Sequence, residues 1–224
     1  MVPGWDLASS EAALDLAERH GPMIDAAVGV HPHHAAEVDE SGWQHLATRA
    51  RDPRASAVGE IGLDYFRTLS PHPVQREALA RQLDIAADAV LPVLVHDRDA
   101  HDDVTAALLA WTGPPGREVH GILHAFSGDA MMATRLVDGG FLVSFALPVA
   151  FRSAIGPRSA APALMDGQFL VETDAPYLGP DRDRRNEPVT VLRVLAELAV
   201  LRGVPVESLV EPVRAAYERL VPPG

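Results

Sequence analysis

The sequence predicts an α/β fold in which parallel strands close into a TIM-type (β/α)8 barrel. Short, continuously apolar segments alternate with longer segments of helical periodicity, which is typical of a parallel sheet covered by helices. Polar residues follow these apolar segments one after another, at His31, Glu60, His96, His124 and Asp174. In a closed barrel all strands end at one edge, which carries the active site, whereas an open doubly wound sheet concentrates its site at one switch point. Polar residues at so many strand ends therefore favour the barrel.

Length, composition and charge limit the class of protein. The chain has 224 residues, 47% hydrophobic and 22% charged, and we expect one domain over residues 1–224. No apolar run reaches the roughly 18 residues of a membrane helix, so we expect a cytoplasmic protein without a membrane partner. The absence of cysteine excludes disulfides and thiolate metal sites. The formal net charge of −12 argues against nucleic-acid binding by the whole surface, but not against phosphates met through bound cations.

Hydrophobic periodicity and capping residues define the elements of the N-terminal half. Asp6 or Ser9 caps the first helix, in which Leu14 and Ala17 face the core. Pro73 suits the first turn of a long helix. The predicted elements are a strand stub at 2, a helix at 7–19, a strand at 26–30, a helix at 42–51, a strand at 55–59, a helix at 73–89, a strand at 92–95 and a helix at 100–111.

The C-terminal half continues the alternation after a clear break at Gly113-Pro114-Pro115-Gly116. Its strands are again unbroken apolar runs, as expected for strands buried on both faces. The predicted elements are a strand at 121–123, a helix at 130–138, a strand at 141–145, a weak helix at 159–165, a strand at 169–174, and helices at 188–202 and 206–220.

Glu60 is the most informative single residue. Small and apolar residues lead into this carboxylate, and a glycine-containing turn follows. Burying it without compensation costs several kcal/mol, so it needs a cation or strong hydrogen-bond donors. Taken alone, Glu60 is equally compatible with a salt bridge to an arginine at the end of a strand.

Three later strands end in the same way, and together the four residues predict a metal site. Glu60, His96, His124 and Asp174 lie too far apart in the chain to share a helix, and they meet only if their strands are neighbours. Two imidazoles and two carboxylates form a ligand set for Zn²⁺, Mn²⁺ or another divalent cation. Glu60 is placed to bridge two cations about 3.5–4 Å apart, which would activate a water molecule. Asp174 is the candidate to accept the proton of that water.

Other polar residues are weaker candidates. His31 and His33 are expected over the mouth of the site, although His-Pro-His is also an ordinary loop sequence. The segment 182–186, Arg-Asp-Arg-Arg-Asn, has guanidinium groups for a phosphate or is a solvated charge run. Glu172 shares a strand face with Asp174 and therefore needs a buried partner.

At these positions the chain resembles the TatD family of metal-dependent hydrolases, which are amidohydrolase-like TIM barrels. The resemblance implies a deoxyribonuclease-type hydrolase of DNA or another phosphodiester, with two divalent cations (Zn, Mg or Mn). It implies that Glu60 bridges both cations, that His96 and His124 bind one, and that Asp174 binds the other. It also implies that Arg98 and Arg185 lie near the substrate. The matching segments, in family order, are 28–33, 59–64, 92–98, 123–128, 172–178 and 185–188.

One family feature has no match here. The family opens with a strand that carries a His-x-His pair, two ligands of the metal that Asp174 binds, and no such pair precedes His31. We therefore expect a barrel that is N-terminally incomplete, without the first strand and its helix. The metal held by His96, His124 and Glu60 is then expected to keep its affinity better than the other.

Two alternative functions follow from the same residues. The first is hydrolysis of a small ester, lactone or amide by the same metals, which differs from a nuclease in the width of the pocket and the lack of a phosphate-binding arginine. The second is a catalytically impaired scaffold that binds partners, which the missing His-x-His pair favours. The sequence does not fix the oligomeric state.

Overall fold

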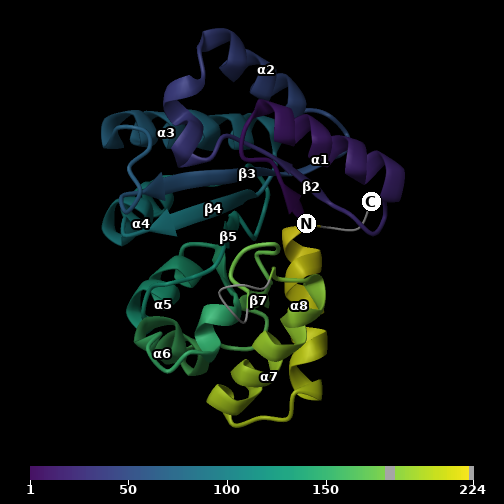
Figure 1. Ribbon diagram of the computed structural model, residues 1–224, viewed down its shortest axis with the longest axis vertical. Coiled ribbons are helices and arrows are strands. Elements are labelled where there is room, and N and C mark those ends of the chain that lie inside the picture. The colour runs from purple at the N-terminus through teal and green to yellow at the C-terminus, as the bar shows by residue number, and fades with distance from the viewer. Residues whose placement is uncertain (180–184, 222–224) are drawn as a thin grey trace. The chain divides into compact units, whose positions relative to one another are not determined.

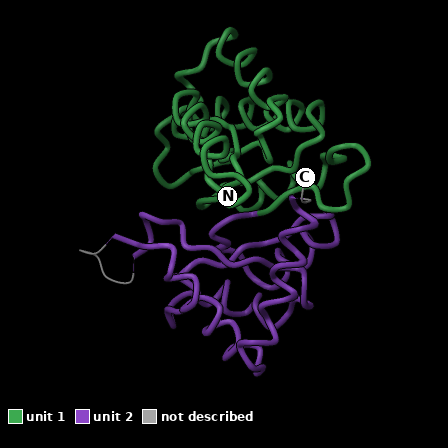
Figure 2. Tube along the Cα trace, turned by 90° about the vertical axis from the view of Figure 1, so that its right-hand side faces the viewer, with its two compact units in different colours: residues 1–122 green, residues 123–224 purple. Residues whose placement is uncertain are grey.

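The computed structural model describes residues 1–179 and 185–221, and it divides into two compact units (Figure 2). Unit 1 spans residues 1–122 and unit 2 spans residues 123–224. The expectation of one domain over the whole chain remains a prediction. Among the described residues, no helix has both the length and the apolar character needed to cross a membrane.

Unit 1 alternates strands and helices, and its neighbouring strands pair in parallel in chain order. Helix α1 packs on β2 and helix α3 packs on β3, alongside which it runs in Figure 1. Its elements are β1 (Val2–Pro3), α1 (Leu7–His20), β2 (Ala26–Val28), η1 (Pro32–Glu37), α2 (Glu40–Ala50), β3 (Ala55–Asp64), α3 (His72–Ala89), β4 (Val93–Arg98) and α4 (His101–Ala110). The boundary with unit 2 falls within β5 (Gly121–Leu123).

Local sequence explains the ends of these helices. Asp6 caps α1 as predicted, because its carboxylate accepts the Ser9 amide at 2.7 Å and Ser9 Oγ accepts the Asp6 amide at 2.9 Å. Pro73 lies in the first turn of α3, where the missing amide proton costs nothing. Leu14 of α1 and Leu79 of α3 are almost completely buried, so each helix places its apolar face on the sheet.

The structure differs from the sequence prediction at two places in unit 1. Strand β3 continues to Asp64 instead of ending at Gly59, because Ile61 and Leu63 are buried and pair with β4. The segment 32–37, to which the sequence prediction assigned no element, is a short 3-10 helix that begins at Pro32. Both differences concern segments beside the predicted site.

Unit 2 has a core in which aromatic rings pack edge to face. Phe145 lies 6.0 Å from Phe169 and 6.2 Å from Phe126, between ring centroids, in edge-to-face geometry. Strands β6 and β7 pair in parallel, and α8 packs on β7. The elements are α5 (Ala130–Asp138), β6 (Phe141–Phe145), η2 (Leu147–Ala150), α6 (Ile155–Ala163), β7 (Phe169–Val171), η3 (Pro188–Thr190), α7 (Val191–Arg202) and α8 (Glu207–Leu220).

Two elements of unit 2 end earlier than predicted. Helix α6 covers residues 155–163 rather than 159–165. Strand β7 ends at Val171, so Glu172 and Asp174 lie in the connection that follows the strand. Asp174 takes a left-handed backbone conformation with φ of 57°, three residues after the strand ends.

Candidate metal centre

Unit 1 brings Glu60 and His96 together, as predicted, and adds His31 to them. Glu60 Oε1 lies 2.9 Å from His96 Nδ1 and 3.4 Å from His31 Nε2. One ligand-type atom from each of the three residues lies within 4.8 Å of the others. The side chains of Glu60 and His96 are 14% and 19% exposed, so the cluster is largely shielded from water but remains reachable.

His31 is held in place as the residue that caps the start of η1. Its Nδ1 accepts the backbone amide of His33 at 3.2 Å, which caps η1. Burial lowers the pKa of His31 even though the Glu60 carboxylate beside it acts in the opposite direction, so the ring is neutral. A neutral ring that accepts at Nδ1 carries its proton on Nε2 and donates it toward Glu60. In this arrangement His31 is a hydrogen-bond donor at the site.

Asp64 is a site residue that our reading of the sequence did not single out. Its Oδ2 lies 2.6 Å from His33 Nε2 and 3.5 Å from His96 Nε2, and its side chain is 4% exposed. Burial alone would raise the pKa of Asp64, but hydrogen bonds from His96, from the Arg67 amide and from His33 outweigh it and hold the pKa well below its usual range. Alternation along β3 from Glu60 would have indicated it, because residues two apart share a strand face.

Gly62 brings the strands of this cluster close together. It pairs with His96 across β3 and β4 and has φ of 137°, a conformation open to glycine. A Cβ built at position 62 would lie 2.0 Å from the carbonyl oxygen of His96. The missing side chain therefore allows the close approach of the backbone that carries His96.

In unit 2, His124 is paired with Glu172. Glu172 Oε1 lies 3.4 Å from His124 Nδ1 and also accepts the backbone amide of Ala125. The predicted need of Glu172 for a partner is thus met by His124 and Ala125. A carboxylate on Nδ1 orients the imidazole and favours Nε2 as its outward-facing atom, which is how carboxylates support metal-binding histidines.

Asp174 lies in a connection that is fixed by Asn186. The Asn186 side chain, which is buried, donates to the carbonyl oxygens of Thr173 at 2.6 Å and Leu178 at 3.3 Å. The Asp174 carbonyl accepts the amide of Tyr177 at 2.8 Å. Asn186 appears in the matched motif, but nothing in the sequence alone indicates that it clamps this connection.

The predicted substrate-binding residues differ in their contacts and exposure. His33 is bound to Asp64 and lies inside the cluster of unit 1. Arg98 is exposed at the end of β4, and its guanidinium carbon lies 5.0 Å from the ring centroid of Phe66. Arg185 is exposed beside Asn186, and residues 182–184 of the predicted arginine-rich segment lie outside the described residues.

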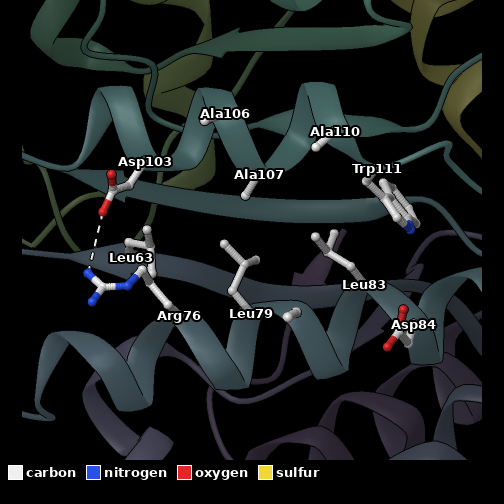
Figure 3. Close-up of a pocket in the computed structure, with 11 residues that line it drawn as sticks. Leu63, Arg76, Leu79, Leu83, Asp84, Asp103, Ala106, Ala107, Ala110 and Trp111 are labelled. Carbon is white, nitrogen blue, oxygen red and sulfur yellow. Dashed lines mark hydrogen bonds and ion pairs between the residues drawn. The ribbon is translucent and has the colours of Figure 1, made fainter.

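A separate pocket of about 380 Å³ lies between α3 and α4 (Figure 3). Leu79, Leu83 and Trp111 contribute to its apolar lining, and the ion pair between Arg76 and Asp103, 3.5 Å apart, lies at one end. None of the predicted site residues lines it. This pocket is therefore not the predicted metal site.

The cluster in unit 1 fits a divalent cation in its chemistry. A carboxylate and neutral imidazoles are the ligands that such ions prefer, and the burial of the group favours a charge that neutralises Glu60 and Asp64. Of the four predicted ligands, Glu60 and His96 lie in unit 1, while His124 and Asp174 lie in unit 2. That all four bind around the same ions stays a prediction.

Comparison with known proteins identifies the family. The model of the family described as "TatD related DNase" matches residues 1–222. The chain is 33% identical to the uncharacterized metal-dependent hydrolase YabD of Bacillus subtilis, over 93% of this chain and 81% of the relative. It is 36% identical to the 3'-5' ssDNA/RNA exonuclease TatD of Pantoea ananatis, over 93% of this chain and 82% of the relative.

Solved structures agree with the fold class. The crystal structure of YJJV, a TatD homolog from Escherichia coli K12, superposes with a TM-score of 0.91 at 29% identity, over 99% of this chain and 85% of that chain. A TatD family hydrolase from Entamoeba histolytica, at 18% identity, shares the fold with a TM-score of 0.83 over 99% of this chain and 84% of that chain. The predicted TIM-type α/β fold and the predicted family are confirmed, and the chain belongs to the TatD family of metal-dependent hydrolases.

Proposed function

We propose that this chain is a nuclease that hydrolyses phosphodiester bonds of single-stranded DNA with divalent cations, two in the complete site. Zn²⁺, Mg²⁺ and Mn²⁺ are the candidates. The observation that carries the proposal is the meeting of Glu60 and His96, with 2.9 Å between Oε1 and Nδ1, in a chain of the TatD family. The exonuclease named for the Pantoea relative acts on single-stranded DNA and RNA, which supports the choice of substrate.

Each residue has a proposed role. Glu60 would be the shared ligand, His96 and His124 would bind one cation, and Asp174 would bind the other. A bound divalent cation would supply a Lewis acid and lower the pKa of water. Asp174 would accept the proton that the attacking water gives up.

The remaining residues bind and orient the substrate. His31 would donate from Nε2 to a phosphate oxygen of the substrate. His33 keeps its ring fixed through Asp64, 2.6 Å away. Arg98 and Arg185, both exposed, bind phosphates that flank the scissile bond.

The test is hydrolysis of an end-labelled single strand and of its duplex, with EDTA or with each cation added. We expect cleavage of the single strand only with a cation, and a loss of at least about 100-fold in Glu60→Gln, since even residues behind a metal ligand cost 10- to 100-fold. Glu77→Gln is the matched control, because Glu77 is an exposed residue of α3 that contacts Arg81 at 3.4 Å. Equal activity of Glu60→Gln and wild type would refute the proposal.

The same assay separates the two alternatives. Hydrolysis of nitrophenyl esters, lactones or amides without cleavage of DNA would favour a small-molecule hydrolase. Binding of the cations without hydrolysis of any of these substrates would favour the scaffold. The cytoplasmic location remains an expectation from the sequence.

A further inference from the structure

The ring of Phe66 is exposed two residues after Asp64, a member of the metal cluster. It lies in the turn that follows β3 and is 62% exposed, whereas Phe145 and Phe169 are 1% exposed in the core. A large aromatic side chain in contact with water loses the free energy that its burial would provide. Single exposed apolar residues are common on proteins, so the neighbours of Phe66 decide whether it has a role.

The turn that carries Phe66 is tied to the cluster. Asp64 Oδ1 accepts the amide of Arg67 at 2.7 Å, and Asp64 Oδ2 lies 2.6 Å from His33 Nε2. The same carboxylate therefore fixes the turn on one side and an imidazole of the site on the other. Phe66 is held two residues from a member of the candidate metal centre.

The neighbouring aromatic residue is already used within the protein. The ring of Tyr65 stacks on His72, with centroids 3.8 Å apart and an interplanar angle of 16°. Its hydroxyl donates to Asp103 at 2.5 Å. Tyr65 thus anchors the turn, and Phe66 is the ring that the turn presents.

Arg98 lies over the Phe66 ring. Its guanidinium carbon is 5.0 Å from the ring centroid, within the range of a cation–π contact. Arg98 pairs with Asp64 in the register of β3 and β4, and it lies two positions beyond His96 on the same strand. Two strand residues span about 6.6 Å, so the backbone of Arg98 lies close to that of His96.

A ring and a guanidinium at this position suit a single strand. Every base has a π-face, so stacking on an aromatic side chain binds bases without regard to sequence. In a duplex these faces are covered by neighbouring bases. The net charge of −12 gives the protein no general attraction for phosphates, so local contacts of this kind have to supply the affinity.

We infer that Phe66 stacks on an unpaired base of a single-stranded nucleic acid and holds the strand at the metal centre, with Arg98 beside it to bind a phosphate. This inference rests on the proposed function. It assigns to Phe66 a role in substrate binding and not in the chemical step.

The test compares two strands of equal length, one with normal bases and one with abasic residues near its labelled end. For wild type, we expect KM to be about 5- to 100-fold higher on the abasic strand. Phe66→Ala should raise KM on the normal strand by a similar factor and leave kcat within about twofold, and Phe66→Tyr should restore the wild-type KM. Leu69→Ala, at a 65% exposed residue of the same loop, is the matched control.

The outcomes distinguish this inference from the proposed function. If the single strand is cleaved but Phe66→Ala raises KM equally on both strands, or on neither, stacking is refuted while the nuclease stands. If wild type cleaves no strand, the proposed function fails. Fluorescence anisotropy of the same labelled strands then decides on stacking, because Phe66→Ala must weaken binding of the normal strand alone.

Discussion

The two units hold their candidate metal ligands in different ways. In unit 1, Glu60 and His96 lie within strands β3 and β4, and hydrogen-bonded partners surround them. In unit 2, His124 and Asp174 follow strands β5 and β7 and lie in connections. Strand positions are fixed by the ladder of the sheet, whereas connections need side chains to fix them.

The supporting contacts reflect this difference. In unit 1 the ligands support one another, since Glu60, His96 and Asp64 are joined through ring nitrogens and carboxylate oxygens. In unit 2 the support comes from residues outside the predicted ligand set, with Glu172 behind His124 and Asn186 across the connection of Asp174. We therefore expect unit 1 to be sensitive to changes in its backbone and unit 2 to changes in these supporting side chains.

Tryptophan fluorescence allows unit 1 to be followed separately. The chain has three tryptophans, Trp5, Trp43 and Trp111, and all of them lie in residues 1–122. Unfolding monitored by fluorescence thus reports on unit 1, while far-UV circular dichroism reports on the helices of both units. Comparing the two signals shows whether a substitution affects unit 1 alone or both units.

The largest effect is expected from Gly62→Ala. The new Cβ would lie 2.0 Å from the carbonyl oxygen of His96, at a backbone φ of 137° that disfavours alanine. We expect a loss of about 3 kcal/mol or more in the free energy of unfolding, from the steric overlap and the strained backbone together. The measurement is urea unfolding followed by tryptophan fluorescence.

Gly116→Ala is the control for Gly62→Ala. Gly116 also has positive φ, at 74°, but a Cβ there would meet no atom within 4 Å. Only the conformational cost of about 1 kcal/mol is then expected. Equal shifts for the two variants would show that the approach of β3 to β4 at Gly62 has no special role.

Glu60 and Asp64 show which site residues the sequence predicts and which it does not. Glu60 was predicted because a lone carboxylate after apolar residues is conspicuous, and the structure places it against His96. Asp64 was missed as a site residue because the strand was predicted to end at Gly59. The continuation of β3 depends on the pairing of Ile61 and Leu63 with β4, which is a tertiary contact that local pattern does not contain.

The alternation of strands and helices was predicted well because its signals are local. Apolar runs and caps such as Asp6 are local signals, and the helices they predict agree with the structure to within a few residues. The role of Asn186 is not local, since its side chain reaches the carbonyl of Thr173, thirteen residues away. Contacts of this kind appear only once the chain is folded.

The second prediction tests the supporting residues of unit 2. Glu172→Gln keeps the size of the side chain but removes the charge next to His124 Nδ1, 3.4 Å away. Nuclease activity and cation affinity are expected to fall about 10- to 100-fold, as for other residues behind a metal ligand. Fluorescence-detected unfolding, which reports on unit 1, should stay at the wild-type midpoint.

Two results would contradict this view of unit 2. A loss in Glu172→Gln as large as that in Glu60→Gln would mean that Glu172 is itself a ligand. Full activity would mean that His124 does not need its carboxylate partner. The cation affinity can be measured by titration calorimetry with Mn²⁺ or Zn²⁺, independently of turnover.

The smallest effect concerns an ion pair in unit 1 outside the site. Asp52 accepts from Arg54 Nε at 2.9 Å and Nη2 at 2.8 Å, just before β3. These hydrogen bonds lower the pKa of Asp52 to about 2. Because the pKa is lower in the folded state, the stabilisation is present above the unfolded value near 3.8 and is lost as the pH falls through about 2.

Asp52→Asn should therefore lower the free energy of unfolding by about 1 kcal/mol at pH 7, a value reduced for the solvent around the pair. The difference from wild type should shrink between pH 4 and pH 2. Asp88→Asn, which removes a more exposed partner of Arg51 at 3.5 Å, should give a smaller change at pH 7. Asp52→Asn is expected to lower the unfolding midpoint of unit 1 measured by fluorescence and to leave cation affinity unchanged. The stability of this unit and the geometry of its metal ligands would then be set by separate contacts.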